Sequence, residues 1–131
     1  MTSVEETLVA ALLADAAVSA LVSDRVFVTG GRQGATRPYV TVQRITTKTN
    51  ASLDASSTLD AALTQIDSWA DTALAARGLA EAVRAAIDCR DIETQDPWFN
   101  AVLQDDRGPT TDEETRAFRV SQDYDLWHSR S

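Results

Sequence analysis

The chain has 131 residues, of which 44% are hydrophobic, so it is long enough for one domain covering residues 1–131 and too apolar for wholesale disorder. Its formal net charge of -8 argues against a duplex-DNA-binding surface, because such surfaces need clustered Lys and Arg. Cys89 is the single cysteine, so no intrachain disulfide forms, and the longest apolar run, residues 8–14, is too short to span a membrane. We expect no signal peptide, because Glu5 and Glu6 stand where a basic segment would lie.

The first predicted element is helical and ends near Ser23. Ser3 and Glu6 have the spacing of a capping box, in which each side chain satisfies a free backbone amide of the other residue. Apolar residues recur at helical spacing on both sides of Asp15. Asp15 either interrupts or recaps this helix, so the pattern fits one helix or two.

Strand-forming residues then fill three segments, residues 25–29, 39–47 and 59–70. In the second segment Val40 and Val42 share one face whereas Ile45 lies on the other, which indicates either a β-bulge or burial on both faces. The small and polar residues between these segments predict loops at 30–37 and 48–58.

The longest amphipathic helix is predicted over residues 72–88. Asp71 is the expected N-cap, because its short carboxylate accepts a hydrogen bond from an exposed amide of the first turn. The apolar stripe is formed by Leu79, Val83 and Ile87, widened by Ala76, Ala80 and Ala86. Gly78 costs about 1 kcal/mol relative to Ala inside a helix, and a close approach of the helix to a sheet would explain it.

The C-terminal third predicts an edge strand, a charged loop and a final strand. Pro97 divides an irregular strand over residues 92–105, and Gly108-Pro109 punctuates a loop over residues 105–115. In the last strand the packed face carries Phe118, Val120, Tyr124 and Leu126. This strand is amphipathic to its end, so it could also augment the sheet of a neighbouring chain.

The resulting order is α-β-β-β-α-β-β. Short connections between consecutive strands favour antiparallel pairing, and each helix has one apolar face to bury. The sequence therefore predicts an α/β (α+β) fold, with a mostly antiparallel sheet of four to five strands and two main helices packed on one face.

No group of residues predicts catalysis, a cofactor or a metal. His128 is the sole histidine and lies three residues from the last residue, which is a poor position for a buried Ser-His-Asp site. Cys89 is expected to be structural, because free cysteines are mostly buried. The acidic residues of 105–115 lack the spacing of a calcium loop, and residues 30–34 (GGRQG) lead into a strand rather than a helix N-terminus. We predict that the chain is not an enzyme.

Tryptophans and polar loops indicate an interaction surface instead. Trp127 has the parity of the polar face of the last strand, and a large aromatic there is typical of an interface, with core packing at the rim as the alternative. Trp69 also falls near a strand end. The predicted interface residues are Trp69, Trp127, Arg32, Gln33, Asp105 and Asp106.

Four segments in succession resemble the phage tail completion or tail terminator family of long-tailed phages and gene transfer particles. They are ALVSDRVF (20–27), QGATRPYVTVQRI (33–45), QIDSWADTALAARGLAEAVRAAID (65–88) and FRVSQDYDLWH (118–128). Their order and spacing extend the resemblance over nearly the whole chain. Each segment alone is of common composition, and their succession carries the likeness.

The resemblance implies a structural virion protein at the tail neck, assembled in the bacterial cytoplasm, with no membrane contact. It implies a homo-hexameric ring at the head-proximal end of the tail tube, which ends tube polymerisation and joins the tail to the head-tail connector or stopper protein. DNA would pass through the lumen only as cargo. The alternatives are another neck or head-tail joining protein, a small cytoplasmic adaptor without catalytic activity and, more distantly, a small hydrolase.

Overall fold

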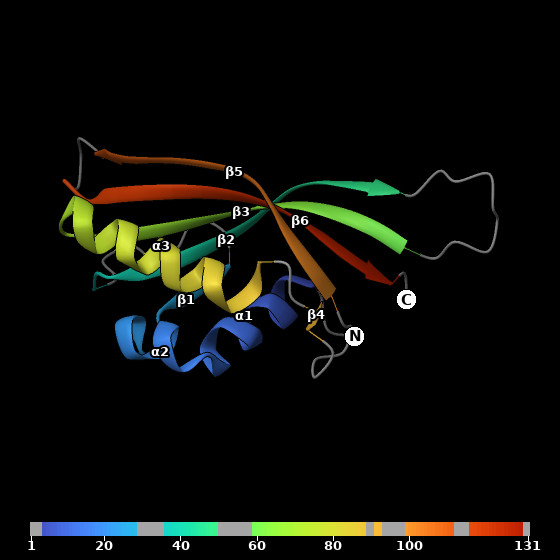
Figure 1. Ribbon diagram of the computed structural model, residues 1–131, viewed down its shortest axis with the longest axis horizontal. Coiled ribbons are helices and arrows are strands. Elements are labelled where there is room, and N and C mark those ends of the chain that lie inside the picture. Colours follow the sequence, from blue (N-terminus) through green and yellow to red (C-terminus); the bar gives the residue numbers. More distant parts are fainter. Residues whose placement is uncertain are drawn as a thin grey trace.

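A computed structural model describes residues 4–28, 36–49, 59–88, 91–92, 99–111 and 116–129 of the chain. Within these residues there are three helices, α1 (Val4–Ala14), α2 (Ala16–Val22) and α3 (Ala73–Ile87). The strands are β1 (Val26–Val28), β2 (Tyr39–Thr49), β3 (Leu59–Ala70), β4 (Asp91–Ile92), β5 (Phe99–Thr111) and β6 (Phe118–Ser129). Figure 1 shows all three helices on one face of a twisted sheet.

The strands form one six-stranded sheet in the order β1-β2-β3-β6-β5-β4. β1 runs parallel to β2, and every other neighbouring pair is antiparallel. The predicted α+β class and mostly antiparallel sheet are thus confirmed, with the two-residue β4 added to the expected four to five strands. β6 pairs along its length with β3 on one side and with β5 on the other, so the prediction that the last strand augments a neighbouring chain's sheet is wrong.

Asp15 divides the N-terminal helical region into two helices. Its Oδ1 accepts hydrogen bonds from the amides of Ala17 and Val18, at 3.0 and 3.1 Å, and its own backbone is extended. The carboxylate therefore caps α2 instead of continuing α1. Each helix turns its apolar side to the core, where the fully buried residues are Leu8, Leu12, Val18 and Val22.

α3 has the predicted apolar stripe, since Ala76, Leu79, Ala80, Val83 and Ile87 are all buried. The predicted N-cap is wrong. The N-cap is Thr72, whose Oγ1 accepts a hydrogen bond from the Ala75 amide at 3.1 Å. Asp71 instead accepts a hydrogen bond from Arg37 Nε at 2.6 Å.

Gly78 does not mark a close approach of α3 to the sheet. A Cβ placed on Gly78 would meet no atom within 4 Å, and the residue is exposed. The helix therefore packs through its apolar stripe, and Gly78 lies on the solvent side.

Bulges explain where the strand patterns are irregular. The pairing of β2 with β3 shifts between Arg44 and Thr46, which places Ile45 in the predicted β-bulge with its side chain 48% exposed. The predicted loop over residues 105–115 is wrong as far as Thr111, because β5 stays paired with β6 to that residue. Shifts in register on β5, one of them around Gly108, absorb the residues that do not fit a regular strand.

The main core lies between the helices and the sheet. It joins the buried residues of α1, α2 and α3 to inward-facing residues of β1, β2, β3, β5 and β6, among them Val40, Ile66, Ala101, Tyr124 and Leu126. A smaller cluster near the start of α3 contains Ala70, Ala76, Ala80 and Val120. No helix in the described part of the chain has the length and apolarity that crossing a membrane requires.

Candidate interaction surface

The helices leave the other face of the sheet uncovered. Side chains alternate between the two faces of a strand, and Ile66 of β3 and Tyr124 of β6, both even-numbered, are fully buried on the side of the helices. The odd-numbered residues consequently point to the opposite side, which we call the open face. Across β3 and β6 this face carries the pairs Ala61–Trp127, Leu63–Asp125, Gln65–Asp123, Asp67–Ser121 and Trp69–Arg119.

An aromatic row crosses one end of the open face. The ring of Tyr39 stacks on that of Trp69, with centroids 5.8 Å apart and planes at 16°, and Phe27 lies on the far side of Tyr39 at 5.9 Å. The Arg119 guanidinium lies over the other side of Trp69, 5.4 Å from the ring centroid. Trp69 Nε1 also donates a hydrogen bond to Thr41 Oγ1 at 3.1 Å. These contacts hold the three rings in fixed positions on the adjacent strands β1, β2 and β3, with the guanidinium supplied by β6.

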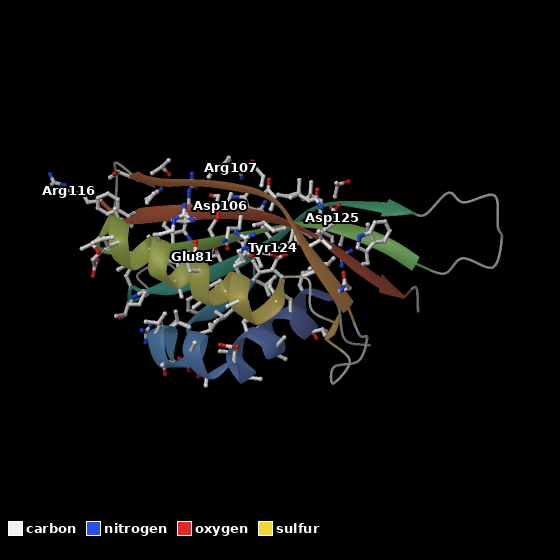
Figure 2. The ribbon with its side chains drawn as sticks, in the orientation of Figure 1. Glu81, Asp106, Arg107, Arg116, Tyr124 and Asp125 are labelled. Carbon is white, nitrogen blue, oxygen red and sulfur yellow. The ribbon has the colours of Figure 1, made fainter. Side chains whose placement is uncertain are left out.

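The middle of the open face is ionic. Arg107 of β5 donates hydrogen bonds to Asp123 at 2.8 Å and to Asp105 at 2.5 Å. The hydrogen bond with Asp123, followed by that with Asp105, raises the pKa of Arg107 above its ordinary value. Figure 2 shows Arg107 on the side of the sheet away from the helices. Gln65 Nε2 donates a hydrogen bond to Asp67 at 3.0 Å. The polar side chains in the middle of the open face thus form hydrogen bonds with one another.

The other end of the open face is more apolar. Asp125 lies between Leu63 of β3 and Val102 of β5, its cross-strand neighbours. Trp127 follows on the same side of β6 and is 37% exposed. The parity predicted for Trp127 is therefore confirmed, and its ring lies at the surface.

Asp106 faces the helices and belongs to a different network. It accepts two hydrogen bonds from Arg77 of α3, at 2.9 and 3.0 Å, and one from Gln122 Nε2 at 3.1 Å. Gln122 in turn accepts a hydrogen bond from the hydroxyl of Tyr124 at 3.3 Å, and burial raises the pKa of this tyrosine. Figure 2 shows Asp106 and Tyr124 between α3 and the sheet. The network links the core to the surface of α3.

The predicted interface residues are thus separated by the fold. Trp69, Trp127 and Asp105 lie on the open face, whereas Asp106 lies on the helical side. Arg32 and Gln33 fall outside the described residues, as do Cys89 and Trp98. The predicted interface residues do not include Tyr39, Arg119 and Asp125, although the parity of the last strand places Arg119 and Asp125 on its polar face. Only the pairing of β2, β3, β5 and β6 brings these residues together.

The described residues hold no group of three or more His, Cys, Asp or Glu side chains that could bind a metal ion. A shallow depression on α3 is lined by Glu81, Arg84, Ala85 and Asp88, and two of these residues are already paired, since Arg84 Nε donates to Asp88 at 3.2 Å. The open face is therefore the candidate functional surface, because its aromatic and charged side chains suit contact with another protein.

Comparison with known proteins gives the chain its family. Residues 6–129 match the family described as Tail completion protein gp17. A solved chain from a structure titled "Virion of native gene transfer agent (GTA) particle" has a similar fold, with a TM-score of 0.74 and 17% identity over 97% of this chain and 95% of that one. No curated protein sequence matches significantly. The predicted resemblance is confirmed, and so is the prediction that the chain is not an enzyme: it belongs to the Tail completion protein gp17 family, a non-catalytic family of structural tail proteins.

Proposed function

We propose that the chain is a tail terminator: copies of it form a hexameric ring at the head-proximal end of the tail tube, stop tube polymerisation and join the tail to the head connector. Membership of the tail completion family supports a role at the end of a tail. The ring, its partners and its position on the tube are our inference.

The observation that carries the proposal is the uncovered face of the sheet. It presents Tyr39, Trp69 and Trp127 together with charged residues and is covered by no element of the described chain. Tryptophan, tyrosine and arginine are enriched where protein contacts contribute most to binding. Contacts between rigid aromatic groups also cost little conformational entropy, because the rings are already fixed by their neighbours.

The acidic composition supports passage of DNA without binding. A net charge of -8 disfavours attachment to the phosphate backbone, which requires basic side chains to displace counterions. A neck component of this charge would allow DNA to move through a lumen.

Negative-stain electron microscopy of the purified chain, alone and mixed with tail tubes, tests the proposal. We expect closed rings and tubes with one end capped, and added protein should shorten tubes that are still assembling. A chain that stays monomeric and never caps or joins a tube would overturn the terminator role. Binding to the isolated head connector without binding to tubes would instead identify another head-tail joining protein.

A further inference from the structure

Asp125 is a carboxylate that has no partner among the described residues and lies in a partly apolar setting. It is half-buried on the open face between Leu63 and Val102 and makes no hydrogen bond or ion pair with another described residue. The neighbouring Asp123, in contrast, is paired with Arg107. Partial burial lowers the local dielectric constant, so a nearby opposite charge attracts this carboxylate more strongly than it would in water.

Arg116 has the charge opposite to that of Asp125 and is also unpaired among the described residues. It is exposed, has a positive φ of 58°, and has no ion pair with the described residues. The described arginines elsewhere each contact an acid, a carbonyl or an aromatic ring, and these are Arg25, Arg37, Arg44, Arg77, Arg84, Arg107 and Arg119. Figure 2 shows Arg116 projecting from one end of the molecule.

The two residues cannot pair within one chain. Nine positions separate Arg116, which precedes β6, from Asp125 within it, and this corresponds to roughly 30 Å of extended chain. Each lies near an exposed apolar side chain, because Leu74 is 86% exposed at the Arg116 end and Trp127 is 37% exposed beside Asp125. One end therefore offers a cation with an aliphatic group, and the other offers an anion with an aromatic group.

We propose that neighbouring copies of the chain join head to tail, with Arg116 of one copy paired with Asp125 of the next. The occupant of the Asp125 surface is thus a second copy, chosen by complementary charge. Two different surfaces make this contact heterologous, and a heterologous contact closes into a ring when its rotation divides a full turn. The inference rests on the ring proposed above and names the residues that hold it together.

Charge reversal with mixing tests the contact. Arg116→Asp and Asp125→Arg should each weaken self-association at least about tenfold in sedimentation equilibrium at low salt, because each opposes two like charges. A mixture of the two variants should recover association. In the mixture, the acid introduced at position 116 of one variant faces the base introduced at position 125 of the other. At the next contact, the unchanged Arg116 of the second variant faces the unchanged Asp125 of the first. A ring with an even number of copies can therefore alternate the two variants.

Asp24→Arg is the matched control for Asp125→Arg, because Asp24 is an exposed acid at the turn before β1 and its reversal changes the net charge by the same amount. It should leave association unchanged. If Asp125→Arg melts early, Asp125→Asn removes the charge without added bulk and should also weaken association.

The outcomes separate the contact from the ring. If both single variants form rings as the wild type does, or if their mixture stays dissociated, the Arg116–Asp125 contact is overturned and the ring is left in place. A wild-type chain that remains monomeric, also in the presence of tail tubes, would overturn the ring itself and the contact with it.

Discussion

Arg77 of α3 donates hydrogen bonds from Nη1 to both carboxylate oxygens of Asp106 on β5, at 2.9 and 3.0 Å. Its Nη2 donates to the carbonyl of Gly108 at 2.9 Å. Arg77 thus connects α3 to β5 at Asp106 and Gly108, the two positions that flank Arg107 in the sequence. Hydrogen bonds between charged groups of this kind are stronger than hydrogen bonds between neutral groups.

Replacing Arg77 with Met should lower the free energy of unfolding by about 1–2 kcal/mol, because Asp106 and the Gly108 carbonyl lose charge-assisted hydrogen bonds. Urea denaturation followed by circular dichroism measures this change. Arg77→Lys is the control, since it keeps the charge but not the forked geometry, and its loss should be smaller. Equal stability of Arg77→Met and the wild type would show that water replaces these bonds at no cost.

Local patterns in the sequence were sufficient to predict the elements whose apolar residues recur at a regular spacing. The stripe of Leu79, Val83 and Ile87 predicts α3, and the parity of β6 predicts which side is buried, because each pattern depends on neighbours within one element. Asp15 is sufficient to predict a break but not its form. Its role as a cap depends on the backbone conformation of Asp15 itself, which is extended.

Features that depend on pairing between distant segments were not predictable. Gly108-Pro109 is typical of a loop, yet tertiary pairing with β6 keeps β5 in the sheet to Thr111. The aromatic row exists only because the register places Tyr39 opposite Trp69 and Trp69 opposite Arg119. A residue's own neighbours in the sequence carry no information about that register.

The two described glycines of this chain should respond oppositely to alanine. Gly78→Ala should stabilise by about 0.5–1 kcal/mol, because the site is helical and open and Ala is the better helix former. Gly108→Ala should destabilise, because Gly108 has a φ of 108° and a Cβ would lie 2.7 Å from the Arg119 carbonyl oxygen. Thermal melts of both variants measure the difference. A higher melting temperature for Gly108→Ala would mean that the backbone relaxes there.

Ser68 is the described residue whose buried side-chain oxygen has no hydrogen-bond partner. Ser68→Ala removes this hydroxyl without adding volume, so it should be neutral or stabilise the fold by up to about 1 kcal/mol. Ser68→Val is the matched contrast, since its extra methyl groups must fit a fully buried site and should destabilise. A marked loss of stability in Ser68→Ala would indicate that the hydroxyl binds an internal water.

Val83 is fully buried at the centre of the α3 stripe. Val83→Asp should prevent soluble folding, because an unpaired carboxylate would be buried in the core. Ala85→Asp provides the control, since Ala85 is exposed on the same helix and its replacement should leave a folded protein. Soluble expression and the near-ultraviolet circular dichroism spectrum report the outcome. A well-folded Val83→Asp protein would contradict the orientation of α3 against the sheet.

The two tryptophans of the open face should separate folding from assembly. Trp69 has a stacked ring, a hydrogen bond and an overlying guanidinium within its own chain, so Trp69→Ala should cost about 3 kcal/mol or more in stability. Trp127 is 37% exposed, so Trp127→Ala should change the melting temperature little while weakening ring formation and tube capping. Differential scanning calorimetry and negative-stain counts of capped tubes, taken on the same preparations, give both quantities. Parallel losses of melting temperature and assembly in Trp127→Ala would instead assign Trp127 to core packing at the rim of the sheet.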